Sequence, residues 1–138
     1  MAEAAACRIH SSLILDFLVV RIDYAVVMAA VVRCTAVIGL ALLRGGDLGT
    51  LERVIRNLAA SITGMICDGG NEGCTMKGIV AVDAAFRAVS LALRGIAVAP
   101  VHGICAATPE ATMRNMGRIA SPGMVGTEKT MIEILEEK

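Results

Sequence analysis

The sequence predicts an all-α protein, a bundle of about five or six helices that pack through small apolar residues. Apolar residues make up 56% of its 138 residues, whereas aromatic residues make up 2% and tryptophan is absent. The core therefore has to consist of alanine, valine, isoleucine, leucine and methionine. Several segments also repeat apolar residues at the spacing of one helical face. With this length and no obvious linker, a single domain is the simplest organisation.

The N-terminal third is the most apolar region. Residues 1–33 form a first segment that we expect to be helical, and the apolar run from Leu13 continues to Leu43. Tyr24–Leu43 has the length of a membrane-spanning helix. However, Arg33 lies in its middle, and a central arginine is costly in a bilayer. A helix buried in protein is therefore preferred, with a membrane span as the less favoured alternative.

The clearest amphipathic helix follows Arg44-Gly45-Gly46-Asp47, where the glycines end the preceding segment and Asp47 can cap the next helix. Apolar residues line one face at the spacings i, i+3, i+4 and i+7, and polar residues fill the other. The apolar face consists of Leu51, Val54, Ile55, Leu58, Ala59 and Ile62, and the polar face of Glu52, Arg53, Arg56 and Asn57. This helix leads directly into a loop rich in cysteine and glycine.

The next helix is predicted over Gly78–Leu93, which is apolar almost all round, with Gly95 placed to cap its end. Such a helix is mostly buried. Ile96–Val101 is a short run typical of a β-strand, broken by Pro100, and a loop with His102 and Cys105 follows it.

Two shorter helices complete the chain. Thr108-Pro109-Glu110 reads as a cap, a first-turn proline and a first-turn acid, opening a helix that continues through Met113 and Met116. Ser121-Pro122-Gly123 breaks this helix. A last amphipathic helix begins at Gly126-Thr127, and its inward residues are expected to be Met131, Ile132 and Leu135.

Charge and cysteine content exclude some functions. Thirteen basic and thirteen acidic residues balance, so no basic field attracts nucleic acid or an anionic membrane. The five cysteines are an odd number, and no secretory signal precedes them. A reducing, cytoplasmic setting is therefore expected, in which thiols serve metal binding or catalysis rather than disulfides.

The chemistry-bearing stretch is Met65–Lys77, where glycines and acids surround Cys67 and Cys74. Cys105 lies in a second loop with His102. The spacing matches neither a zinc ribbon nor a ferredoxin motif. Three interpretations stay open: a metal or cluster at Cys67, Cys74 and Cys105; a structural zinc ion held by these three and His102; and buried, inert thiols in a helical interaction or membrane protein. Lys77 is a candidate base or carboxylate-binding residue, and His102 a candidate proton shuttle.

The loop resembles the signature of the serine dehydratase-like α family, which includes L-cysteine desulfidase and the UPF0597 group. The similarity rests on Cys67-Asp68-Gly69 followed by Gly73-Cys74-Thr75-Met76-Lys77. Six further stretches also match the family: Gly45-Gly46-Asp47-Leu48, Arg56-Asn57, Val82-Asp83-Ala84-Ala85, His102-Gly103-Ile104, Arg114-Asn115-Met116-Gly117 and Gly123-Met124-Val125-Gly126-Thr127-Glu128-Lys129.

This resemblance implies an α-helical catalytic domain with a [4Fe-4S] cluster held by three cysteines, one iron being open to the substrate. The implied reaction is β-elimination of L-cysteine or L-serine to pyruvate and ammonia, with sulfide from cysteine. Cys67 is the first ligand candidate, followed by Cys74 and Cys105, with Gly69 in the cluster loop. Lys77, Asp68 and His102 are the implied catalytic candidates.

The chain also departs from the family pattern. Gly70-Asn71 replaces the usual Ala-Lys, which removes a positive charge from the loop. Family members are much longer, and residues 1–33 diverge from them. Residues 34–138 therefore correspond to the C-terminal part of the larger catalytic domain. We expect the chain to form a homo-oligomer or to need an N-terminal partner subunit, and to be inactive without it.

Overall fold

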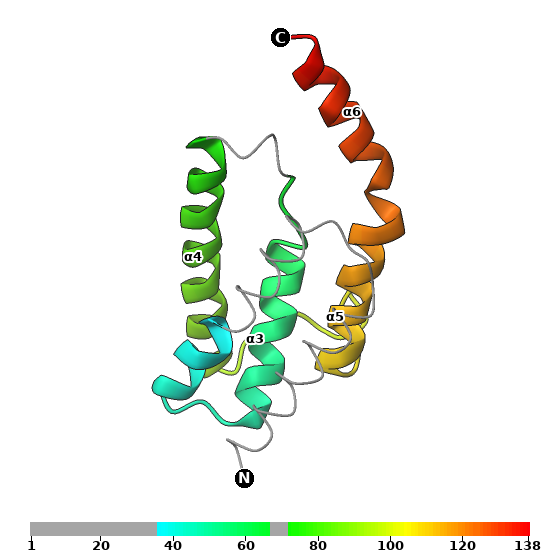
Figure 1. Cartoon of the computed structure of the whole chain (residues 1–138). Coiled ribbons are helices and arrows are strands. Elements are labelled where there is room, and N and C mark those ends of the chain that lie inside the picture. The colour runs from blue at the N-terminus through cyan, green and yellow to red at the C-terminus, as the bar shows by residue number, and fades with distance from the viewer. Residues whose placement is uncertain (1–35, 67–71) are drawn as a thin grey trace.

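The computed structural model describes residues 36–66 and 72–138, and the secondary structure in these two ranges is helical, with no strand. Its elements are α3 (Leu48–Ser61), α4 (Glu72–Leu93), α5 (Pro109–Arg118), the π-helical turn η1 (Ile119–Gly123) and α6 (Val125–Glu136), and Figure 1 labels the four α-helices. Residues 36–43 form a further helical stretch. The predicted all-α class is confirmed. The expectations for residues 1–33 and for most of Tyr24–Leu43 fall outside the described residues.

Helix α3 is the centre of the bundle, with α4 against one side and α5 against another (Figure 1). Its predicted apolar face is confirmed, because Leu51, Val54, Ile55 and Leu58 are almost completely buried. They form the core with Val37, Ile38, Ala41, Ala85, Ala88, Val89, Ala92 and Met113. Four of these core residues are alanines, namely Ala41, Ala85, Ala88 and Ala92, which agrees with the core of small apolar residues that the aromatic-poor composition predicted.

The helix ends at Gly45 and Gly95 have the same geometry. Gly45 has a φ of +78° and Gly95 a φ of +77°, a region that L-residues with a side chain rarely adopt. After α4, the Gly95 amide donates to the Ala92 carbonyl at 3.0 Å and the Ile96 amide to the Leu91 carbonyl at 2.9 Å. This pair of bonds is the Schellman motif, and it confirms the predicted end of this helix.

Helix α4 differs from its prediction. One narrow stripe is buried, consisting of Ala81, Ala85, Ala88, Val89 and Ala92. The opposite side exposes large apolar side chains, namely Met76, Ile79, Val80, Val82, Phe86, Leu91 and Leu93. The prediction of a mostly buried helix was therefore wrong, because only α3 and the residues before it pack onto α4 in the described part of the chain.

The last helices begin as predicted but pack differently. Thr108 caps α5 by accepting a hydrogen bond from the Ala111 amide at 3.2 Å. The chain kinks within η1, where Ser121 has extended backbone angles. Helix α6 packs mainly against η1, and Ile132 and Leu135 are exposed. The expectation that these two side chains point into the bundle was wrong.

None of the helices in the described ranges combines the length and the apolarity that crossing a membrane requires.

Candidate functional site

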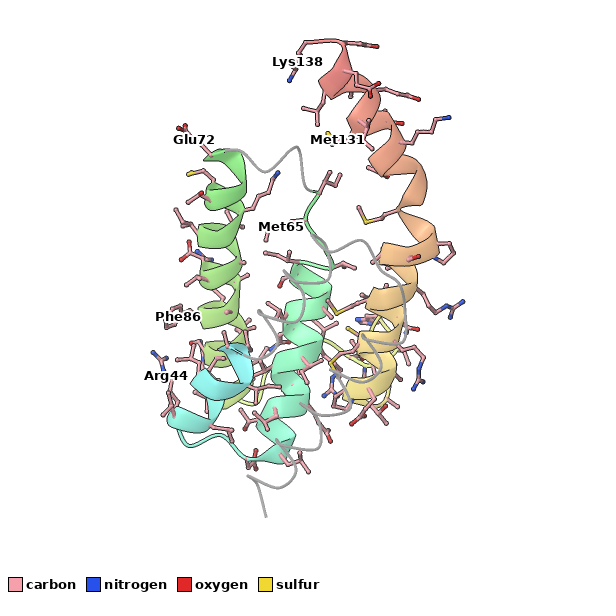
Figure 2. The ribbon with its side chains drawn as sticks, in the orientation of Figure 1. Arg44, Met65, Glu72, Phe86, Met131 and Lys138 are labelled. Atoms are coloured by element: carbon pink, nitrogen blue, oxygen red, sulfur yellow. The ribbon has the colours of Figure 1, made fainter. Side chains whose placement is uncertain are left out.

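The predicted cysteine loop joins α3 to α4 at one end of the bundle. Met65 and Glu72 lie on either side of this junction (Figure 2). Cys67, Asp68 and Gly69 belong to residues 67–71, which lie outside the described residues. Their predicted roles therefore stay predictions.

The beginning of α4 carries the other two predicted residues of this loop. Cys74 is the third residue of the helix. Lys77 follows three residues later and is half-buried. The structure therefore places these two residues within about one turn of each other at the start of α4, next to the junction.

The loop between α4 and α5 is held by Asn57, a buried residue in the middle of α3. The side-chain nitrogen of Asn57 (Nδ2) donates to the Ile96 carbonyl at 2.9 Å, and its side-chain oxygen (Oδ1) accepts from the Val98 backbone amide at 3.0 Å. A longer bond of 3.4 Å reaches the Ala88 carbonyl. One side chain of α3 is therefore the hydrogen-bond partner of two backbone groups in the segment that follows α4.

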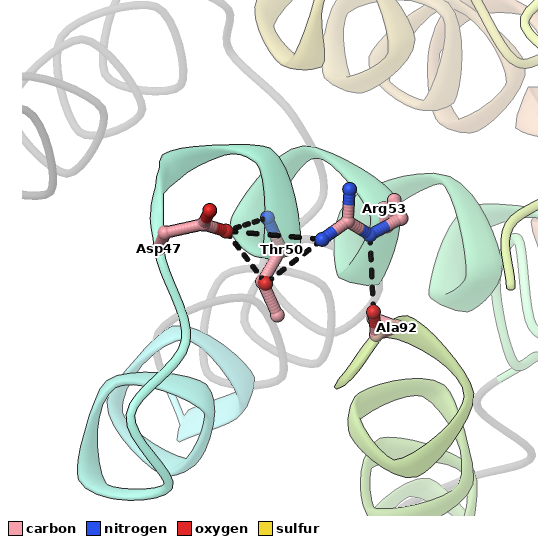
Figure 3. Close-up of polar contacts among 4 residues, drawn as sticks. All are labelled: Asp47, Thr50, Arg53 and Ala92. Carbon is pink, nitrogen blue, oxygen red and sulfur yellow. Dashed lines mark hydrogen bonds and ion pairs between the residues drawn. The ribbon is translucent and has the colours of Figure 1, made fainter. Parts of the chain in front are cut away.

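Two arginines of α3 extend this arrangement. The Arg56 Nε donates to the Val98 carbonyl at 3.1 Å. The Arg53 Nε donates to the Ala92 carbonyl at 3.0 Å, near the end of α4. Arg53 also donates to the Thr50 hydroxyl at 3.0 Å and lies 3.8 Å from Asp47 (Figure 3). The polar face of α3, predicted simply as the side opposite the apolar one, therefore binds the backbone of a distant segment.

Helix α5 fixes the far end of the same loop. The fully buried Thr112 hydroxyl accepts from the Ala106 amide at 2.9 Å. The Asn115 side chain donates to the Ile104 carbonyl at 3.0 Å. These bonds lie on either side of Cys105, so α3 and α5 together determine where this cysteine lies.

Cys105 is a buried free cysteine whose thiol donates to the Arg56 carbonyl at 3.6 Å. Burial raises the pKa of the Cys105 thiol, and the nearby Arg56 only partly opposes this. The thiol is therefore neutral near pH 7. Arg56 precedes the last residue of α3 by five positions, or about 7.5 Å along the helix. Cys105 thus packs against the middle of α3 rather than at its cysteine-loop end.

His102 lies in a turn, where its amide donates to the Ala99 carbonyl and its carbonyl accepts from the Cys105 amide. Its side chain is exposed. In the two described ranges, no three histidine, cysteine or acidic side chains are grouped closely enough to hold a metal ion. Because Cys67 and Asp68 lie outside those ranges, this finding does not test the predicted ligand set.

Sequence reasoning missed the importance of Asn57, Thr112 and Asn115. Their partners lie elsewhere in the chain, the Asn57 partner Val98 being 41 residues away, so helical periodicity gives no signal for them. The family context Arg56-Asn57 and Arg114-Asn115 contains two of these residues, and it was the available signal.

Comparisons with known proteins identify the chain's relatives. Residues 23–133 match the family described as serine dehydratase alpha chain. A UPF0597 protein of Clostridium botulinum strain Hall is 44% identical over 99 residues, which cover 72% of this chain and 23% of the relative. A UPF0597 protein of Desulfotalea psychrophila is 37% identical over 103 residues, 75% of this chain and 24% of the relative.

A third UPF0597 protein, from Oleidesulfovibrio alaskensis, is 36% identical over 110 residues, or 80% of this chain and 26% of the relative. The chain thus spans about a quarter of the length of these curated relatives. No solved structure matches it. The chain corresponds to only a part of the length of these relatives. Since the family match extends over most of the sequence, the chain belongs to the serine dehydratase alpha chain family.

Proposed function

We propose that this chain is the cluster-binding portion of an iron–sulfur lyase that acts on L-cysteine or L-serine by β-elimination. The products are pyruvate and ammonia, together with sulfide when cysteine is the substrate. The observation that carries the proposal is the family match over residues 23–133, which includes the whole Cys67–Lys77 loop. This chain covers 23% of its relative's length. We therefore propose this activity for the complete catalytic domain, to which the chain contributes the cluster-binding portion.

The proposed ligands are Cys67 and Cys74. Cys74 lies in the first turn of a 22-residue helix, where the helix dipole favours the thiolate that a metal requires. We assign Cys105 a structural role instead, because its thiol is buried and donates to the Arg56 carbonyl at 3.6 Å. The proposal therefore takes the third ligand from residues outside the described ranges or from a partner chain.

When bound, a [4Fe-4S] cluster supplies an open iron site for the substrate's β-thiol or β-hydroxyl group. The half-buried Lys77 lies one turn after Cys74, where its ammonium group can hold the substrate carboxylate, or its neutral form can accept the α-proton. Asp68 and Gly69 would orient the substrate within the loop. The exposed His102 imidazole is the alternative proton acceptor. Cysteine ligands such as Cys67 and Cys74 have to stay reduced, which agrees with the proposed cytoplasmic setting.

The test is the iron and acid-labile sulfide content after anaerobic reconstitution. We expect equal amounts of iron and sulfide in the wild-type chain, and the loss of both in Cys67→Ser and Cys74→Ser. Cys105→Ser is the matched control, and it should retain both. Zinc without sulfide would instead support the structural zinc domain considered above, and a wild-type chain that binds no iron would contradict the proposal.

A further inference from the structure

The outward side of α4 is an apolar surface in the described part of the chain. Its large side chains are Met76, Ile79, Val80, Val82 and Phe86, each between 45% and 61% exposed. Ile79, Val82 and Phe86 repeat at the spacing of one helical face. Figure 2 shows Phe86 on the side of α4 that is turned away from α3. This face would normally be covered, because monomeric proteins rarely expose contiguous apolar patches of this kind.

Helix α6 carries a second surface of the same kind. Ile132, Ile134 and Leu135 are between 41% and 55% exposed, and the main neighbour of the helix is η1. In Figure 1, α4 and α6 lie on opposite sides of α3, and both extend past the end of α3. The two helices therefore lie on either side of the end of α3 from which the chain continues toward α4.

We propose that the exposed faces of α4 and α6 are the docking surface for the polypeptide that makes up the rest of the family's catalytic domain. The matched part covers only 23% of the Clostridium botulinum relative, so most of that relative's chain remains to cover these faces. A second copy of this chain is the less suitable occupant. A two-fold contact buries one patch against itself, whereas here two helices on opposite sides of α3 need cover.

The first test is co-expression with the part of the Clostridium botulinum relative that lies outside the matched 99 residues. We expect a one-to-one complex by sedimentation velocity. Val82→Asp on α4 and Ile132→Asp on α6 should each weaken the complex about tenfold or more, because they bury an unpaired carboxylate. Val101→Asp is the matched control, since Val101 is 84% exposed on the loop after α4, and it should bind like wild type.

The second test places both parts in one molecule. In a chimera where this chain replaces the matched residues of the relative, Val82→Asp should lower the melting temperature more than Val101→Asp does. In the isolated chain the two substitutions should have equal effects, because both side chains are more than half exposed there.

Three results would overturn the proposal. The relative's remaining part could be soluble but fail to bind this chain. The Val82→Asp and Val101→Asp chimeras could have the same melting temperature. The isolated chain could form a dimer that Val82→Asp disrupts. None of these measurements requires iron, so their failure is distinguishable from failure of the proposed cluster function.

Discussion

Replacing Asn57 by alanine tests whether one side chain holds the loop that carries His102 and Cys105. The change removes the bonds to the Ile96 carbonyl and the Val98 amide, together with the longer 3.4 Å bond to the Ala88 carbonyl, which we leave out of the sum because of its length. Each is worth about 1 kcal/mol, and leaving the two partly buried backbone groups without a partner costs about 1 kcal/mol more. The better helix propensity of alanine returns roughly 0.6 kcal/mol. The expected loss in the free energy of unfolding is therefore about 2.5 kcal/mol.

Urea denaturation followed by circular dichroism measures this loss, and hydrogen exchange at the Val98 amide locates it. Asn115→Ala is the matched control, because Asn115 donates one such bond, to Ile104, and should cost about 1 kcal/mol or less. If Asn57→Ala unfolds within about 0.5 kcal/mol of wild type, or leaves Val98 exchange unchanged, the reasoning is refuted.

Two further predictions concern the turn before α3 and its cap. Gly46→Ala should destabilise the fold, because a Cβ atom there would lie 2.8 Å from the Ala41 carbonyl oxygen. Gly78→Ala in α4 is the control: its Cβ atom would meet nothing within 4 Å, so it should stabilise the fold by about 0.5–1 kcal/mol. Equal melting temperatures of the two variants would contradict this reasoning. Hydrogen bonds from the Thr50 hydroxyl and amide lower the pKa of Asp47. Its contribution to stability is therefore present above about pH 4 and is lost as the pH falls through the lowered value. Thermal melts from pH 7 to pH 2 should show a smaller acid loss for Asp47→Asn than for wild type, and parallel curves would exclude the effect.

The sequence predicted those elements whose signals are local. Asp47, Thr108 and Pro109 start their helices where expected, and Gly95 ends α4, because capping depends on residues a few positions apart. The apolar face of α3 was also predicted from its helical periodicity. The prediction could be confirmed because the helices that cover this face, α4 and α5, belong to the described part of the chain.

The outward faces of α4 and α6 could not be predicted, because an apolar pattern indicates that a surface is covered but not which chain covers it. The same limit applies to the candidate site. The pattern identified Cys67 and Cys74 as unusual, but only the structure shows that Cys105 faces the Arg56 carbonyl. Hydrogen bonds such as Asn57 to Val98, 41 residues apart, depend on tertiary packing, which no local spacing contains.

The contact of Arg53 with Ala92 has a mechanical consequence. Arg53 and Asn57 attach α3 to α4 at Ala92 and Ala88, near the last turns of α4. From Ala92 the helix extends over 20 residue steps to Glu72, or about 30 Å. A rotation of roughly 5° about this anchored end would move the first turn by about 3 Å. A partner on the outer face of α4 can therefore shift the first turn, which carries Cys74 and extends beyond Ala81 and Ala85, the buried residues nearest to that end of the helix.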